Sequence, residues 1–356
     1  MSATPSSWLV PFRGDLGSSA AEVGGKAAGL IDMARQGLPV PDGFALSVEA
    51  FRQFVQSAGV EPELASLIRG FAPDDLASAE AVGAQMRAVV ERAALPDDLE
   101  RAIAAAYGAL GESVGDSEPL VAVRSSATAE DSEAASFAGE YESFLGIRGI
   151  EQVFEYVRRC WASLYTGRGL SYAARNNLAP LDIAMGVVVE VLVPATRSGV
   201  AFTLDPARGD RMKIVIEASV GLGLSVVGGE VTPDRFVVDK LSLETVERTR
   251  GSKAIEYELG SDGTVQVHET SSDQRETYCL SDDEVRKLAE LAKRVERTYR
   301  APQDIEWAIA GDDDVLLLQC RPVTAWTGQA AGPAYDPNES VLGWVTASLM
   351  KGVSAR

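Results

Sequence analysis

Four polar residues towards the end of the sequence have the types and spacing of a site for magnesium-bound phosphate. Asp304 and Glu306 alternate with apolar residues in D-I-E-W-A-I, and Gln319 and Arg321 do the same in V-L-L-L-Q-C-R. Because side chains two positions apart in a strand share a face, each pair projects from one side of its strand. Carboxylates and amides supply the oxygen ligands that Mg²⁺ takes, and a guanidinium binds phosphate.

The turn between these two strands decides whether the four side chains meet. It contains G-D-D-D, and an even number of loop residues would place both polar pairs on one face of the hairpin. An odd number would separate them. An amphipathic hairpin with a solvated outer face is the alternative interpretation of the same pattern.

A lysine near the N-terminus is a second candidate for phosphate binding. G-G-K-A-A-G-L (24–30) places Lys26 directly after two glycines and before an apolar-periodic stretch. Glycines permit a ligand to approach the backbone closely, and the start of a helix attracts anions. The segment is not a Walker A loop, since Ala20 and Ala27 stand where that loop needs Gly and Ser or Thr. A turn with a surface lysine is the alternative.

A third segment combines an arginine with hydroxyl side chains and a glycine turn. V-A-V-R-S-S-A-T-A-E-D (121–131) precedes S-F-A-G-E-Y-E-S-F-L (136–145), which predicts a strand, a hydroxyl-rich loop and a turn. Arg124 can bind phosphate through two parallel hydrogen bonds, and the backbone amides around Ala138 and Gly139 can surround it. The serines next to Arg124 are ordinary turn formers in the alternative interpretation.

The overall charge excludes several other functions. The chain has 33 Lys and Arg against 52 Asp and Glu, so its net charge of −19 disfavours nonspecific binding to nucleic acid or to anionic membranes. The single histidine, His268, leaves no multi-histidine metal site, and three scattered cysteines make no disulfide framework. The N-terminus lacks the pattern of a signal peptide and no apolar run is long enough to span a membrane, so we expect a cytoplasmic protein.

Local periodicity predicts a mixed α/β (α+β) protein that positions these residues on both strands and helices. Apolar residues recur at helical spacing from Ile150 to Tyr165, and again from Val285 to Tyr299 after a capping-box pattern that begins at Ser281. Short β-rich runs predict strands at 187–193, 213–217, 235–239, 304–309 and 315–321.

The distribution of these elements predicts two lobes. We expect an N-terminal lobe over residues 1–186 that contains a helical subdomain at about 58–119, and a C-terminal lobe over 187–326. Residues 327–356 have the composition of a linker and tail.

The order of the motifs resembles that of a known enzyme family. The segments at 121–131 and 136–145, together with R-S-G-V-A-F-T, G-L-G-L-S-V-V-G-G-E-V-T-P-D and L-L-Q-C-R-P-V-T, are similar to the ATP-binding domain of phosphoenolpyruvate synthase, pyruvate phosphate dikinase and rifampicin phosphotransferase. The resemblance covers about residues 10–325. It implies a two-lobed ATP-grasp fold with a helical insertion in the N-terminal lobe.

The resemblance also implies roles for the residues singled out above. Lys26, Arg124 and Arg321 are expected to act on the ATP phosphates, with Lys26 and Arg124 outside the core. Ala138 and Gly139 belong to a loop that covers the phosphates. ATP and Mg²⁺ are the implied cofactors. The resemblance implies an adenine-binding hinge at Glu190, Val191, Leu192 and Val193. It implies the remaining metal, ribose and phosphate contacts at Asp304, Glu306 and Gln319, and it assigns the metal to Glu306 and Gln319.

Two departures from the family pattern matter. Leu224 stands where the family usually has Glu in G-L-G-E, so a carboxylate role there is lost or is taken by another residue such as Glu217 or Glu230. Family enzymes also carry a phosphate-accepting histidine in a T-S-H or T-S-C-H motif, and this chain has no such motif. We interpret His268 as an ordinary exposed residue.

The resemblance implies the ATP-binding part of a dikinase-type phosphotransferase. Such a protein delivers the β-phosphate of ATP, as a pyrophosphoryl group and with release of AMP, to a histidine on a separate swivelling domain or subunit. The chain would then be either a subunit, as in phenylphosphate synthase, or one domain of a longer enzyme. Two alternatives stay open: a noncatalytic nucleotide-binding regulator, and an ATP-grasp ligase that forms an acylphosphate and releases ADP.

Overall fold

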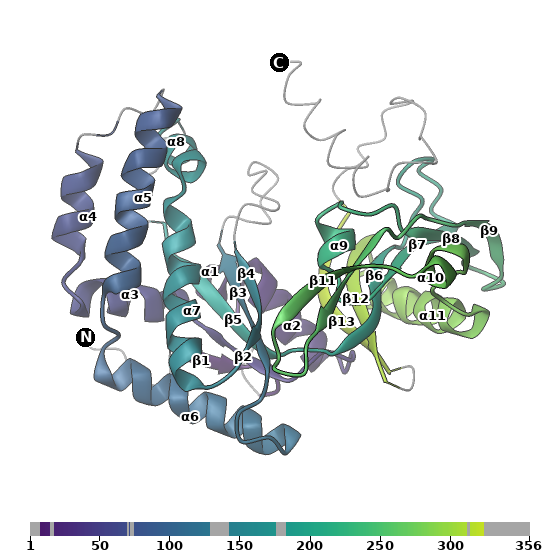
Figure 1. Ribbon diagram of the computed structural model, residues 1–356, viewed down its shortest axis with the longest axis horizontal. Coiled ribbons are helices and arrows are strands. Elements are labelled where there is room, and N and C mark those ends of the chain that lie inside the picture. The colour runs from purple at the N-terminus through teal and green to yellow at the C-terminus, as the bar shows by residue number, and fades with distance from the viewer. Residues whose placement is uncertain are drawn as a thin grey trace. The chain divides into compact units, whose positions relative to one another are not determined.

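The protein forms two compact units. The computed structural model describes residues 8–14, 18–69, 71, 75–128, 142–175, 183–311 and 314–323. The first unit comprises Met1–Arg35 and Asp42–Leu192, and the second comprises Gln36–Pro41 and Val193–Arg356. Both units combine helices with antiparallel sheets (Figure 1), which confirms the mixed α and β class. No helix in the described part of the chain combines the length and the apolar character needed to cross a membrane.

A five-stranded antiparallel sheet organises the first unit. The predicted strand at 187–193 is its central strand β5 (Met185–Val191), which hydrogen-bonds to a neighbour on each side. The first unit therefore runs to Leu192, past the lobe boundary placed at 186 from the sequence. In spatial order the strands are β1 (Leu9–Pro11), β2 (Gly43–Leu46), β5, β3 (Val121–Ala127) and β4 (Ser143–Ile147).

Eight α-helices accompany this sheet in the described residues. Three of them occupy the segment that the sequence marks as helical, at about 58–119. Helix α7 packs on the sheet, and α5 packs on both α7 and α8. The helices are α1 (Ala20–Val23), α2 (Gly25–Arg35), α3 (Val48–Ser57), α4 (Glu61–Ile68), α5 (Leu76–Arg92), α6 (Asp97–Val114), α7 (Ile150–Ala162) and α8 (Gly167–Arg175).

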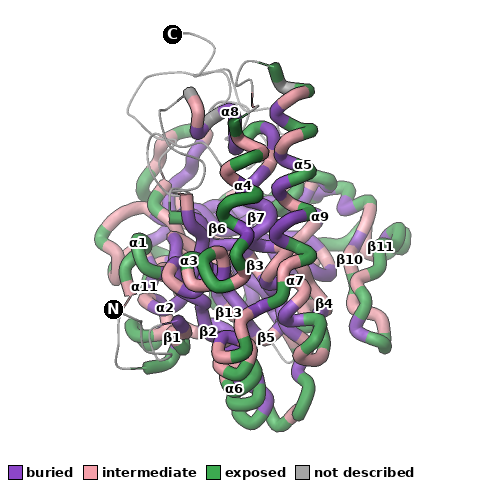
Figure 2. The backbone as a smooth tube through the Cα atoms, turned by 90° about the vertical axis from the view of Figure 1, so that its left-hand side faces the viewer, coloured by how far each residue is buried: buried purple, intermediate pink, exposed green. Residues whose placement is uncertain are grey.

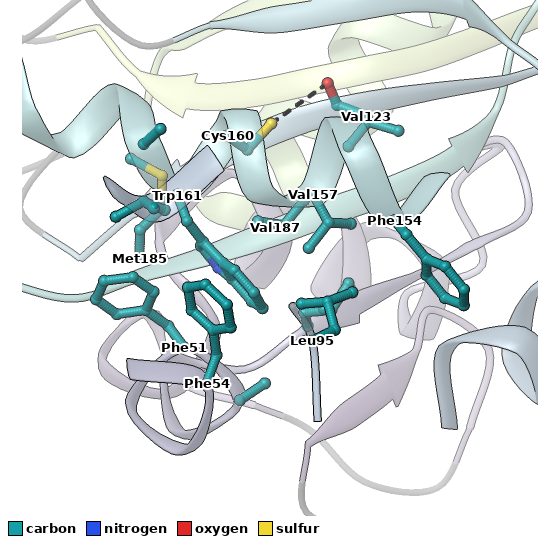
Figure 3. Close-up of a cluster of buried hydrophobic side chains, with 14 of the residues drawn as sticks. Phe51, Phe54, Leu95, Val123, Phe154, Val157, Cys160, Trp161, Met185 and Val187 are labelled. Atoms are coloured by element: carbon teal, nitrogen blue, oxygen red, sulfur yellow. Dashed lines mark hydrogen bonds between the residues drawn. The ribbon is translucent and has the colours of Figure 1, made fainter. Parts of the chain in front are cut away.

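Aromatic packing between α3 and α7 fills the core of the first unit (Figure 3). Phe54 stacks on Trp161 with ring centroids 4.9 Å apart, and Phe51 lies 5.6 Å from the same indole. Aromatic pairs of this kind add about 0.5–1.5 kcal/mol to the stabilisation that burial alone provides. The apolar stripe predicted for the helix that begins at Ile150 is therefore confirmed as a core stripe.

Strand alternation gives this sheet two chemically different faces. Val123 contacts the core on the α7 side, where the Cys160 thiol lies 3.7 Å from its carbonyl oxygen (Figure 3). Arg124 and Ser126 alternate with these core residues and project from the opposite face. Helix α2 docks on that opposite face, because the backbone N–H of Ala27 donates to Ser126 Oγ.

A six-stranded antiparallel sheet organises the second unit. Its four central strands are buried along most of their length, whereas the outer sides of the helices are exposed (Figure 2). In spatial order they are β13 (Asp314–Pro322), β12 (Gln303–Ala310), β6 (Ala195–Phe202), β7 (Lys213–Val220), β8 (Asp234–Asp239) and β9 (Thr245–Thr249). The other elements are the hairpin β10 (Ile255–Leu259) and β11 (Val265–Glu269), and the helices α9 (Leu224–Val227), α10 (Ser272–Glu276) and α11 (Asp282–Tyr299).

Two local features of the second unit fix its edges. Helix α11 begins at the predicted capping box, where Ser281 accepts from the Glu284 backbone N–H and Glu284 accepts from that of Ser281. The segment Gln36–Pro41 lies beside the edge strand β13, where the N–H of Leu317 donates to Pro39 O at 2.8 Å. Covering part of an edge strand satisfies backbone groups that would otherwise be open to pairing with another chain.

Candidate functional site

The β12–β13 hairpin brings its four polar residues together. Asp304 lies directly opposite Arg321, and Glu306 lies directly opposite Gln319. Directly opposed residues of antiparallel strands project from the same face, with Cβ atoms about 4.5–5.5 Å apart. All four side chains therefore share one face of the hairpin, which is the arrangement that the sequence left open.

A β-bulge produces this arrangement. The loop between the last paired residues, Ala310 and Asp314, contains three residues, an odd number that alone would separate the two polar pairs. The register shifts between Glu306 and Trp307, and Leu318 is the extra residue on β13 at that step. Because a bulge adds one residue to one strand, it returns the residues that follow Leu318 to the face of Asp304 and Glu306.

Arg321 is oriented by a carboxylate on the neighbouring strand. Its Nε and Nη2 atoms both lie 2.9 Å from Asp304 Oδ2, and the two side chains are 36% and 10% exposed. Burial raises the pKa of the Asp304 carboxyl, an effect that Arg321 opposes and the nearby Glu306 reinforces. The ion pair with Asp304 fixes the orientation of the Arg321 guanidinium, and the Arg321 side chain stays partly accessible.

Glu306 and Gln319 fit a magnesium ion that arrives with a nucleotide. Both side chains are partly exposed, and together they offer a carboxylate and an amide oxygen on one face. Magnesium in nucleotide sites usually takes one or two protein carboxylates and completes its shell with phosphate and water oxygens. Among the described residues, no group of three or more His, Cys, Asp and Glu side chains could hold a metal ion.

In the first unit, Arg124 is also held by a carboxylate. Its Nη1 atom lies 3.0 Å from Glu190 Oε1, and the two side chains are only 11% and 4% exposed. Glu190 on β5 pairs with Ala122 on β3, so that Arg124 is its diagonal neighbour on the same face. Sequence reasoning assigned Glu190 to the hinge and missed this contact, whose one signal was a lone carboxylate inside an apolar strand.

Lys26 lies at the N-terminal turn of α2, on the sheet face that carries Arg124. It is the second residue of the helix, and Gly24 before it has a φ of +82°, which favours glycine. Ser126, which anchors this turn, belongs to strand β3 and not to the predicted hydroxyl-rich loop, because β3 continues through Ala127. The positive end of the helix, a lysine and an arginine thus share one face, which suits an anion.

The predicted adenine hinge contains the boundary between the two units. Leu192 is the last residue of the first unit and Val193 begins the second. The N–H of Val191 donates to Asp42 O at 2.8 Å, and that of Leu192 donates to Leu120 O at 2.9 Å. Both N–H groups already donate to acceptors within the first unit. Adenine could therefore form hydrogen bonds here only with other backbone groups. The adenine role of this run stays a prediction.

The glycine segment that ends at Leu224 leads into α9, and the two carboxylates considered as substitutes lie in different surroundings. Glu217 is 1% exposed and lies in the same cross-strand row as Glu306, with β6 between their strands. Glu230 is exposed, and its Oε2 atom accepts from the Tyr257 hydroxyl at 2.8 Å. Glu217 is therefore aligned with Glu306 across the sheet, whereas Glu230 lies outside the strands.

Two further predictions concern residues away from the two arginine–carboxylate pairs. Ala138 and Gly139, assigned to a phosphate-covering loop, lie outside the described residues. His268 is exposed on β11 opposite Glu256, as expected of an ordinary surface residue. His268 belongs to the two-stranded β10–β11 sheet, whereas the two arginine–carboxylate pairs lie in the other two sheets.

The mixture of helices and antiparallel sheets is that of an α+β nucleotide-binding protein of the ATP-grasp-like class. Residues 20–340 match the family described as pyruvate phosphate dikinase, AMP/ATP-binding domain, and the chain belongs to that family. The resemblance read from the motifs is therefore confirmed.

Curated relatives extend well beyond the region that they share with this chain. The phosphoenolpyruvate synthase of Aeropyrum pernix is 40% identical over 94% of this chain and 44% of its own length. The phosphoenolpyruvate synthase of Deinococcus radiodurans is 40% identical over 85% of this chain and 40% of its own length. The rifampicin phosphotransferase of Streptomyces sviceus is 39% identical over 86% of this chain and 35% of its own length. The chain thus spans less than half of each.

Proposed function

We propose that this chain is the ATP-binding part of a dikinase-type phosphotransferase. The observation that carries the proposal is the pairing of each predicted phosphate-binding arginine with a carboxylate, Arg124 with Glu190 and Arg321 with Asp304. Membership of the family and the names of the relatives support the same reaction class.

The chain's own residues bind and orient the triphosphate. Lys26, Arg124 and Arg321 are the residues that bind phosphate oxygens in this proposal. Such donors stabilise charge that develops on the transferring group, because they are fixed before the reaction begins. Magnesium, when bound at Glu306 and Gln319, neutralises part of the triphosphate charge.

The phosphate acceptor is a histidine on a separate swivelling domain or subunit. In the proposed reaction a histidine nitrogen forms a bond to the β-phosphorus, the bond between that phosphorus and the bridging oxygen of the α-phosphate breaks, and AMP leaves. The pyrophosphoryl group stays on the histidine. This chain contributes no suitable acceptor, since its one histidine is an exposed residue of β11.

Analysis of the nucleotide products tests this function. The chain is incubated with ATP and Mg²⁺, with and without a histidine-bearing swivelling domain from a family member, and the nucleotides are separated by chromatography. We expect AMP only when that domain is present, and none when its histidine is replaced by alanine. ADP as the product would indicate the ligase alternative, and binding of ATP without any product would favour the regulator.

A further inference from the structure

A buried serine connects the strand that carries Arg124 to the helix that carries Lys26. Ser126 is fully buried, and its Oγ atom accepts a hydrogen bond of 3.0 Å from the backbone N–H of Ala27. Ala27 directly follows Lys26 in the first turn of α2, where backbone N–H groups have no partner within the helix. Ser126 and Arg124 are two positions apart in β3 and share a face of the sheet.

Two glycines bring the same helix turn into direct backbone contact with the sheet. A Cβ atom on Gly24 would lie 1.8 Å from Ser126 O, and one on Gly186 would lie 2.1 Å from Val23 O. Ser126 and Gly186 are directly opposite each other on β3 and β5. The backbone between α1 and α2 therefore lies on these two strands with no side chain between them, and a side chain at either glycine would displace the turn.

We propose that Ser126 is a positioning residue for phosphate binding, which holds the first turn of α2 so that Lys26 and Arg124 reach the same triphosphate. This inference rests on the proposed function, since it assumes that both cations bind phosphate. Removal of the serine oxygen leaves the Ala27 N–H buried without its acceptor. The turn then opens towards water, and Lys26 moves with it.

The preceding residue provides a matched control. Ser125 is also fully buried, but its Oγ donates to Glu142 O at 2.9 Å, and strand alternation places it on the face opposite Arg124. A substitution at Ser125 removes one buried hydroxyl from the same strand without touching α2. The two serines therefore separate a general loss of packing from a loss of helix position.

Titration calorimetry on the 356-residue chain with Mg²⁺ tests the role of Ser126. We expect Ser126→Ala to weaken ATP binding about tenfold, while adenosine, which has no phosphate, changes by less than about twofold. Ser125→Ala should leave both affinities within about twofold of the parent. Equal losses for ATP and adenosine, or no loss for ATP, would overturn the proposal.

A double-mutant cycle with Lys26 makes the test specific. If Ser126 acts by positioning the lysine, Ser126→Ala has no further effect on ATP affinity once Lys26→Ala is present. An undiminished effect in the Lys26→Ala background would show a general structural role and reject the proposal. If Ser126→Ala does not fold, Ser126→Cys, with a weaker acceptor of similar shape, enters the same cycle with the same two outcomes.

The outcome also distinguishes this inference from the function on which it rests. A parent chain that does not bind ATP rejects both the proposed function and the role of Ser126. A parent chain that binds ATP and shows additive effects of Ser126→Ala and Lys26→Ala rejects the positioning role alone. Loss of the Ser126 effect in the absence of Lys26 supports both.

Discussion

The two arginine–carboxylate pairs share a design but differ in burial. Arg124 and Glu190 in the first unit are 11% and 4% exposed and are joined at 3.0 Å through one guanidinium nitrogen. Arg321 and Asp304 in the second unit are 36% and 10% exposed and are joined through two nitrogens. Breaking a buried ion pair leaves a charge without compensation, whereas a more exposed ion regains water. The Arg124–Glu190 pair is therefore expected to stabilise the fold as well as to bind a ligand. The Arg321–Asp304 pair is expected to act mainly in ligand binding.

The largest expected effect is on stability in the first unit. Arg124→Ala should lower the free energy of unfolding by about 3–5 kcal/mol, because the Glu190 carboxylate then lies buried without its cation. The sequence led us to expect an arginine that contacts phosphate and does not stabilise the fold, whereas its side chain is only 11% exposed. Urea unfolding followed by circular dichroism measures the change.

Two variants make this prediction specific. Arg124→Ala/Glu190→Gln should recover a large part of the lost stability, since no unpaired charge remains buried. Arg321→Ala should cost less than Arg124→Ala, because its guanidinium is more exposed. Equal losses at the two arginines would show that burial does not distinguish the pairs.

The next effect concerns ligand affinity in the second unit. Arg321→Ala should weaken ATP binding by about 1.5–3 kcal/mol, the usual contribution of a hydrogen bond to a charged group. Arg297, an exposed residue of α11, provides the control: Arg297→Ala removes the same charge elsewhere and should leave the affinity unchanged. If both variants lose affinity equally, overall charge and not the site accounts for the effect.

A smaller effect is expected at the candidate metal ligand. Glu306→Gln removes one carboxylate and should raise the Mg²⁺ concentration needed for half-maximal ATP binding about tenfold. The exposed Glu258 on β10 offers a matched change, and Glu258→Gln should leave the magnesium dependence as it is in the parent. An unaltered magnesium dependence in Glu306→Gln would remove this residue from the site.

The smallest effect is a pH dependence of stability at Asp304. Burial raises the pKa of this carboxyl in the folded state above its usual value, so the folded protein binds this proton more tightly than the unfolded chain does. The resulting contribution to stability is complete below the unfolded pKa and is lost as pH rises through the folded pKa. Asp304→Asn should therefore gain stability relative to the parent at pH 7 and lose this advantage in acid. A pH-independent difference in unfolding free energy would contradict the raised pKa.

Local signals in the sequence predicted several elements of this fold. The capping box at Ser281 places the start of α11, and the apolar stripe that begins at Ile150 becomes α7 with Trp161 in the core. These signals are reliable because each depends on residues within a few turns of one another. The strand pattern also identified Asp304, Glu306, Gln319 and Arg321 as two pairs on shared faces.

The features that sequence reasoning missed depend on distant residues. The Arg124–Glu190 pair joins positions 66 residues apart, and neither local pattern specifies the other. The hydrogen bond between Ala27 and Ser126 spans 99 residues. The bulge at Leu318 is local, but strand periodicity assumes an uninterrupted register and cannot place it. The first two features join distant residues, and the bulge decides which side chains of the hairpin share a face.

The most direct test of the account asks whether each of the two arginines contributes to ATP binding. Arg124→Lys and Arg321→Lys keep the charge that Glu190 and Asp304 require but lose the planar guanidinium that binds phosphate through two parallel hydrogen bonds. ATP is titrated into the parent chain and into each variant with Mg²⁺ by calorimetry. The account predicts that both variants bind ATP more weakly than the parent chain. An ATP affinity equal to that of the parent in either variant would contradict it.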